Sequence, residues 1–293
     1  MSGHREMASL IRTRIGGHVI EMRTNEAAAR LGDDPEGVHL MRVAVRRLRS
    51  DLRLFRRVLT PIAPADLGPE LSWLGAELGA VRDADVLWSV VTDRLDRMPA
   101  PDRGAARLLL PALEDGRRAA RADLVQALGS ERYSTLLVSL DDLATSPIST
   151  AAGRQPARRL MPRLARRAWR RLHSAAEALG PRADDPDQLH HLRILTKRAR
   201  YAIEACDSAG VSGSRKLARR LARLQDHLGE LHDLVVARDW LRQATLRRCD
   251  ADIAFAAGEL AEMMWQEQCR LTETWHNPWN GANGTRSRPW SGG

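Results

Sequence analysis

The sequence has few aromatic side chains, three cysteines and two lysines, and each shortage excludes a class of protein. Aromatic residues make up 4% of the 293 residues, which argues against extended stacking surfaces for nucleic-acid bases. Cys206, Cys249 and Cys269 are odd in number and lack Cys-x-x-Cys spacing. They predict reduced thiols in a cytosolic protein, not a disulfide framework or a zinc site. No apolar run reaches membrane-spanning length, and the first residues contain no apolar signal core, so we expect a soluble chain.

The motifs of common catalytic sites are also missing. The sequence contains no Gly-rich phosphate loop, no Gly-x-Ser-x-Gly and no His-Glu-x-x-His. Asp83 and Asp85 come nearest to a magnesium-binding pair, and we interpret them as capping or ion-pairing residues. His39 and His190 have no histidine or carboxylate three or four residues later, so metal-ligand spacing is absent. We expect no catalytic activity, no cofactor and no metal.

Arginine, in contrast, is abundant. Lys and Arg number 46 against 37 Asp and Glu, for a net charge of +9, and Lys197 and Lys216 are the two lysines. A polyanion is therefore the first partner to consider. The planar guanidinium suits bidentate phosphate contacts, but a GC-rich genome produces the same bias. Composition alone does not decide whether the arginines reflect phosphate binding or a GC-rich genome.

The spacing of apolar residues predicts an all-α chain. They recur every three or four positions, and alanine, leucine and arginine dominate. Breaks are expected at residues 32–37, 60–69, 98–104, 146–156, 180–187 and 208–214. The last residues have little helix propensity, which predicts a flexible tail over 281–293. Trp275, Trp279 and Trp290 are interpreted as part of a fraying end; an aromatic stacking platform is the alternative.

Two motifs occur twice in the same order. Residues 38–49 align with 189–200, so that His39 matches His190 at an offset of 151 (190 − 39), and Asp83 matches Asp233 at an offset of 150 (233 − 83). This indicates an internal duplication. We expect two similar four-helix-type bundles related by a pseudo-twofold axis. Residues 1–280 would form one domain, with half one over 5–145, a linker over 146–156 and half two over 157–275.

Two segments concentrate the positive charge. Residues 38–59 hold seven arginines and one aspartate, and residues 158–171 hold seven arginines and no acid. Solvated helical faces usually mix signs because like charges at this spacing repel, so purely basic faces predict anion binding. The candidate binding residues on these faces and on the second copy of the motif are His39, Arg42, Arg46, Arg49, Arg53, Arg163, Arg166, Arg170, His190, Arg193, Lys197 and Arg200.

Three local expectations accompany these faces. From His39 to Arg57 the basic stripe would extend about 27 Å along one helix, which suits a polymer better than a monoester. Pro162 is expected in the first helical turn, which would leave Arg158 and Arg159 outside the helix. Arg47 and Arg198 fall off the stripe, and we hypothesise that they pair with Asp83 and Asp233.

The two duplicated motifs resemble those of the CHAD family, the conserved histidine α-helical domain. The resemblance rests on the basic motif at His39 to Arg49, its second copy at His190 to Glu204, and the Leu-Gly-x-x-Arg-Asp type motif at Leu78 to Asp83 and again at Leu228 to Asp233. It covers roughly residues 5–275. It implies two helical bundles with a basic central surface, binding of inorganic polyphosphate without catalysis, and a cytoplasmic location that extends to polyphosphate granules. The implied phosphate contacts are His39, Arg42, Arg46, Arg49, Arg53, His190, Arg193, Lys197 and Arg200.

Other functions stay open. A nucleic-acid backbone offers similar charge, although the basic stripes carry almost no aromatic or amide side chains for reading bases. An accessory subunit of a polyphosphate-metabolising enzyme, or an adaptor on granules, would use faces that the sequence does not identify.

Overall fold

The structure is a computed structural model that describes residues 5–32, 34–59, 63–64, 66–146, 148, 150–180, 185–246, 250–284 and 290. The regular secondary structure of these residues is helical, with no strand among them apart from an isolated antiparallel bridge between Glu6 and Pro156, which confirms the predicted all-α class. The first half contains α1 (Met7–Thr24), α2 (Glu26–Leu31), α3 (Pro35–Leu54), α4 (Arg56–Leu59), α5 (Leu67–Leu95), α6 (Ala100–Arg107), α7 (Leu110–Leu128) and α8 (Glu131–Thr145). The second contains α9 (Ala157–Leu179), α10 (Pro186–Ser208), α11 (Ser214–Leu246), α12 (Ala251–Thr274) and α13 (His276–Asn283).

Helices α3 and α10, which carry the two copies of the basic motif, begin in the same way. Each has an aspartate as its N-cap and a proline as its first residue, where the missing backbone N–H of proline costs no hydrogen bond. The carboxylate of Asp34 accepts a hydrogen bond from the Glu36 amide at 2.8 Å, and that of Asp185 accepts one from the Asp187 amide at 2.9 Å. The caps therefore place His39 and His190 at the same position in their helices.

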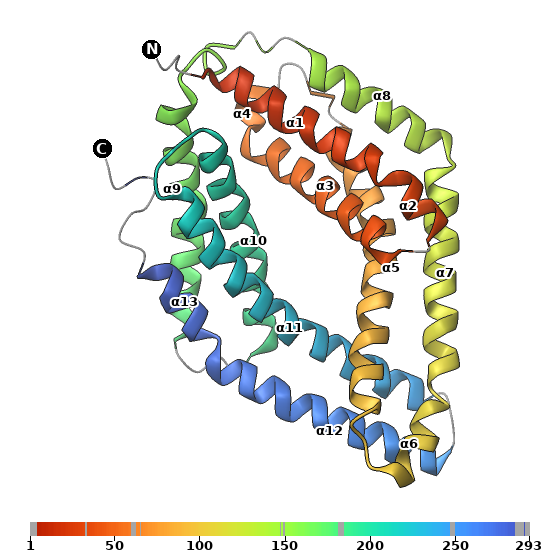
Figure 1. Ribbon diagram of the computed structural model, residues 1–293. Helices are drawn as coiled ribbons and strands as arrows, with labels where there is room; N and C mark the ends of the chain where they lie inside the picture. The colour runs from red at the N-terminus through yellow and green to blue at the C-terminus, as the bar shows by residue number, and fades with distance from the viewer. Residues whose placement is uncertain are drawn as a thin grey trace.

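The long helices surround the two motif helices (Figure 1). α1 lies beside α3, and α9 lies beside α10. α5 packs between α3 and α7, while α11 leaves the α9 and α10 side and extends towards α5 and α12. No described helix combines the length and hydropathy needed to cross a membrane.

Two clusters of buried apolar side chains hold these helices together. The larger cluster runs from Met7 to Ala282 and draws on both halves of the chain. The smaller lies where α5, α6 and α7 meet α11 and α12, and it includes Val91 and Leu260. The core is therefore not divided at the boundary between the halves. The helix order agrees with the predicted duplication, with α3 and α5 corresponding to α10 and α11, and the duplication itself stays a prediction.

Two helix boundaries differ from the expectations. α3 ends at Leu54, and the buried Phe55 separates it from α4, so the basic stripe from His39 does not follow one helix to Arg57. α9 begins at Ala157, which places Pro162 inside the helix and Arg158 within it. The buried row of Ala157, Met161 and Ala165 continues past the proline, and this packing offsets the lost backbone hydrogen bond.

The interpretation of the tryptophans as a fraying end is wrong for the described residues. Trp275 and Trp279 are 1% and 4% exposed, and Trp279 stacks on Trp169 with ring centroids 5.6 Å apart. Trp290 also approaches Trp169, at 5.9 Å. Burial of these rings outweighs the low helix propensity, so α13 extends to Asn283, inside the predicted 281–293 tail. Residues 285–289 and 291–293 lie outside the described part.

Candidate functional site

The two motif helices meet with α5 and α11 around one small cavity. It has a volume of about 100 Å³ and is lined by Arg42 of α3, Asp83, Val86 and Leu87 of α5, Arg193 of α10, and His232, Asp233 and Val236 of α11. Both copies of the basic motif thus contribute to one place. We use the name central cluster for Arg42, Arg46, Arg193 and Lys197 together with His39, His190 and His232.

The cations of the central cluster destabilise one another's charge. Burial, together with the charges of Arg193, Arg46 and Arg42, lowers the pKa of Lys197 from 10.5 to about 7. The pKa values of Arg42 and Arg193 are also lowered, mainly by burial, although a guanidinium keeps its proton. A buried group of like charges is costly to hold together, and an anion bound among them would remove that cost.

The histidines of the central cluster are poised as neutral hydrogen-bonding groups. Nδ1 of His190 lies 3.4 Å from Nδ1 of His232. Burial, with the charge of Arg193, lowers the pKa of both rings, to about 4 for His232. Burial and the charge of Arg82 likewise lower the pKa of His39. A neutral imidazole still donates one N–H to a phosphate oxygen.

Two aspartates compensate only part of this charge. Nη2 of Arg42 lies 3.4 Å from Oδ1 of Asp83, whose side chain is largely exposed. Asp233 lies close enough to Arg193 for the two charges to affect one another, but burial dominates and raises the pKa of Asp233. The site therefore remains open to an added anion.

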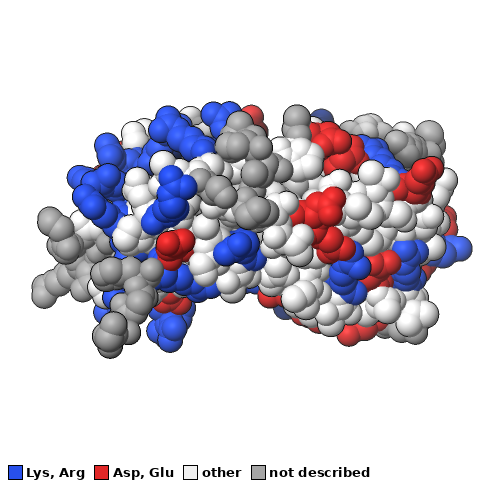
Figure 2. Space-filling view, turned by 90° about the horizontal axis from the view of Figure 1, so that it is seen from above, with Lys and Arg blue, Asp and Glu red and all other residues white. Residues whose placement is uncertain are grey.

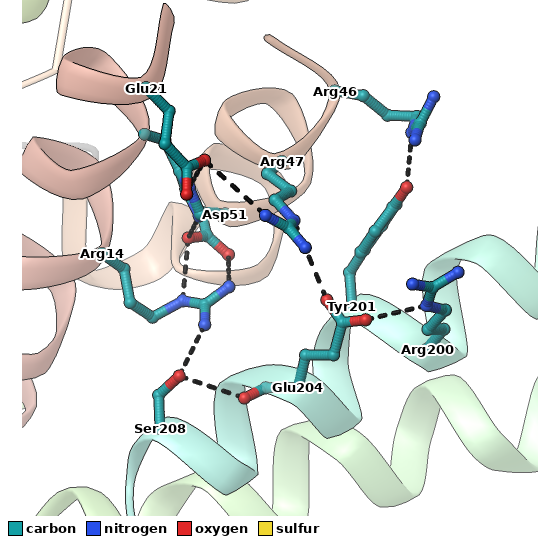
Figure 3. A network of polar contacts seen from close by, with 10 residues as sticks. Arg14, Glu21, Arg46, Arg47, Asp51, Arg200, Tyr201, Glu204 and Ser208 are labelled. Carbon is teal, nitrogen blue, oxygen red and sulfur yellow. Dashed lines mark hydrogen bonds and ion pairs between the residues drawn. The ribbon is translucent and has the colours of Figure 1, made fainter. Parts of the chain in front are cut away.

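The hypothesis that Arg47 pairs with Asp83 is wrong, because Arg42 takes that partner. Arg47 instead lies between two carboxylates from different halves of the chain, with Nη1 3.6 Å from Glu21 and Nε 4.0 Å from Glu204 (Figure 3). Arg198, for which Asp233 was the expected partner, instead lines a different cavity together with Arg53.

A polar network behind Arg47 joins α1, α3 and α10 (Figure 3). Nε and Nη2 of Arg14 each donate to the buried carboxylate of Asp51 at 2.9 Å. Nη1 of Arg14 donates to the hydroxyl of Ser208 at 2.9 Å, which ties α1 to α10. Arg46 donates to the hydroxyl of Tyr201, so the same face of α3 contacts the central cluster and the second half of the chain. The network holds the two motif helices in place.

The structure brings some of the predicted residues together and separates others. The central cluster contains His39, Arg42, Arg46, His190, Arg193 and Lys197. Arg49 lies against α5, where a Cβ on Gly75 would approach its Nη1 to 3.3 Å. Arg53 lines the other cavity, and Nε of Arg200 donates to Glu204 at 2.7 Å. Arg163, Arg166 and Arg170 are exposed on α9 and line no described cavity.

The exposed arginines are unevenly distributed. Figure 2 shows Lys and Arg gathered towards the left end of this face, the side on which α9 lies in Figure 1. Towards the other end they alternate with Asp and Glu. An approaching polyanion would therefore meet more positive charge near α9.

Sequence reasoning missed several residues of the site. Arg82 acts on His39 and Arg42, and His232 contacts His190. Both stand next to the duplicated aspartates Asp83 and Asp233, which we interpreted from the sequence as capping or ion-pairing residues. No group of three or more His, Cys, Asp or Glu side chains that could hold a metal ion is found among the described residues.

Comparisons with known proteins agree with one another. The model of the CHAD domain family matches residues 13–242. An uncharacterized protein of Mycobacterium tuberculosis, known from two strains, is 31% identical over 251 residues. That match covers 82% of this chain and 46% of the relative, so the chain spans about half the length of the curated relatives it matches.

Two solved structures share the fold. The CHAD domain from the plant Ricinus communis is 31% identical, with a TM-score of 0.75 over 98% of this chain and 94% of that one. PptA from Streptomyces chartreusis is 22% identical, with a TM-score of 0.77 over 94% of this chain and all of that one.

Proposed function

The chain belongs to the CHAD domain family, and on that premise we propose that it binds inorganic polyphosphate at the central cluster without transforming it. The observation that carries this proposal is the convergence of Arg42 and Arg46 from one copy of the motif with Arg193 and Lys197 from the other. Each of these cations experiences the charge of the others, and the neighbouring aspartates compensate them only in part.

A polymer of phosphates fits this arrangement better than a single phosphate. The basic stripe that α3 contributes to the central cluster, from His39 to Arg46, spans 7 residues (46 − 39), or about 10 Å of helix, and Arg193 and Lys197 of α10 extend it. Successive phosphates would meet arginine forks along the stripe and neutral imidazole donors in the central cluster. Binding would release counterions, so affinity should fall steeply as salt rises.

Nucleic-acid binding is the rival to be tested, because a sugar-phosphate backbone presents similar charge. Association with polyphosphate granules or with a polyphosphate-metabolising enzyme is compatible with the proposal.

The test compares long-chain polyphosphate, duplex DNA, single-stranded RNA and inorganic triphosphate in one physiological buffer. The variant Arg193→Gln/Lys197→Gln removes two charges from the central cluster. The control Arg219→Gln/Arg223→Gln removes two from exposed positions of α11. For the central variant, the slope of log affinity against log salt should become shallower by about 2, one for each lost phosphate contact.

Preference for polyphosphate that is lost in the central variant and kept in the control supports the proposal. Equal or tighter binding of nucleic acid by the wild type, or equal losses in the two variants, refutes it.

A further inference from the structure

A second, larger cavity lies outside the central cluster. It has a volume of about 420 Å³, within the range of small-molecule sites, and lies among α3, α4, α9 and α10. Its rim carries six arginines, Arg53, Arg56, Arg57, Arg167, Arg171 and Arg198, and no acidic residue lines it. It shares no lining residue with the cavity at the central cluster. The chain thus has a second place where an anion would be held by several guanidinium groups.

Four of the six arginines of this cavity have no carboxylate partner among the described residues. Within the described part of the chain, Arg53, Arg57, Arg167 and Arg171 form no ion pair, whereas Arg132 and Arg117 elsewhere on the surface each bind a carboxylate. Burial lowers the pKa of Arg198, and the charges of Arg53 and Arg171 lower it further. The rim is therefore a group of mutually repelling cations that an anion would stabilise.

The floor of the cavity differs in kind from its rim. It is lined by Leu54, Leu164, Ala168, Leu195 and Ala202, together with Tyr201. An inorganic phosphate chain would contact the arginines but leave this apolar surface without a partner. A ligand that carries a planar apolar group beside its phosphates would cover both.

We propose that this cavity binds a nucleoside polyphosphate, with its phosphates held by the arginine rim and its base lying on the apolar floor. Guanidinium planes both chelate phosphate oxygens and stack on aromatic rings, so the same arginines suit both parts of such a ligand. An acyl chain would cover the apolar floor but would not neutralise six cations. A bare phosphate would neutralise cations but would leave the floor uncovered.

The test measures calorimetric binding of ATP, inorganic tripolyphosphate and adenosine to the full chain. Arg167→Glu/Arg171→Glu reverses two exposed charges of the rim, and Arg219→Glu/Arg223→Glu makes the same change at equally spaced exposed positions of α11. Leu164→Asn alters the floor and leaves the rim intact. Circular dichroism of each variant checks that the fold is retained.

We expect ATP to bind at least about tenfold more tightly than tripolyphosphate, a difference that burial of the base readily supplies. The rim variant should lose at least about tenfold in ATP affinity, because it loses two charge-assisted contacts to the phosphates. Leu164→Asn should weaken ATP and leave tripolyphosphate unchanged. The α11 control and Arg193→Gln/Lys197→Gln should both bind ATP as the wild type does.

Three results would overturn the proposal. Tripolyphosphate binding as tightly as ATP would mean that the floor plays no part and the rim is a general anion surface. Equal losses of ATP affinity in the rim variant and the α11 control would mean that the cavity is not the site. Tighter binding of a single-stranded RNA oligomer than of ATP, lost in the rim variant, would assign the cavity to nucleic acid instead. Because the central variant is tested separately, failure here leaves the polyphosphate proposal intact.

Discussion

Replacing Lys197 by methionine should make the unliganded protein more stable, and by an amount that depends on pH. Lys197 is partly buried among Arg46, Arg193 and Arg42, and its pKa falls from 10.5 to about 7. Below pH 7 the folded protein holds this charge at a cost that the unfolded chain does not bear. As pH rises from 7 to 10.5, the folded protein holds a neutral amine while the unfolded chain stays protonated, so the cost shrinks.

The magnitude follows from the two pKa values. Their difference of about 3.5 corresponds to about 4.8 kcal/mol at pH 6, and the part remaining at pH 9 is about 2 kcal/mol. Lys197 is not fully buried, so solvent screening reduces both figures by about half. Methionine has a similar length and no charge. Its advantage in the free energy of unfolding should therefore decrease by about 1 to 3 kcal/mol between pH 6 and pH 9.

Urea unfolding followed by far-UV circular dichroism measures this difference. Lys216→Met is the matched control, because Lys216 is the other lysine and is exposed on α11. Its effect should be equal at the two pH values. A difference between wild type and Lys197→Met that is the same at pH 6 and pH 9 would show that the Lys197 charge costs nothing in the fold. Polyphosphate should raise the midpoint of the wild type more than that of Lys197→Met, since the cation it neutralises is missing from the variant.

Three further outcomes are expected. Long-chain polyphosphate should bind the wild type more weakly at pH 8.5 than at pH 6.5, because Lys197 loses its proton as pH rises past about 7, and Lys197→Met should remove most of this dependence in titrations at fixed salt. Asp51→Ala should lower the free energy of unfolding by about 3–5 kcal/mol, since it leaves the largely buried Arg14 without its carboxylate; a urea series that gives less than 1 kcal/mol would contradict this. Trp279→Ala should lower the free energy of unfolding by about 3–5 kcal/mol and expose α13 to limited proteolysis. A digestion pattern equal to that of the wild type would show that the stack on Trp169 contributes little.

The agreement between sequence and structure is closest for features that neighbouring residues in the chain determine. Helical periodicity and the breaks expected at residues 32–37 and 180–187 predicted α3 and α10 and the face on which His39, Arg42 and Arg46 lie. The same reasoning failed for Arg47. Its partners Glu21 and Glu204 come from α1 and α10, and the sequence pattern of α3 does not predict contacts with other helices. It failed for Trp279 because helix propensity says nothing about the ring of Trp169 that covers it.

The sequence by itself determined the all-α class, the helix boundaries near Asp34 and Asp185, and the presence of basic faces, since these follow from side-chain periodicity and from caps within a few residues. Only the tertiary structure decided which of those faces meet. It placed Arg42 beside Arg193, left Arg163 exposed, and set Arg167 and Arg198 around an apolar floor, because those neighbours are fixed by packing between helices far apart in the chain.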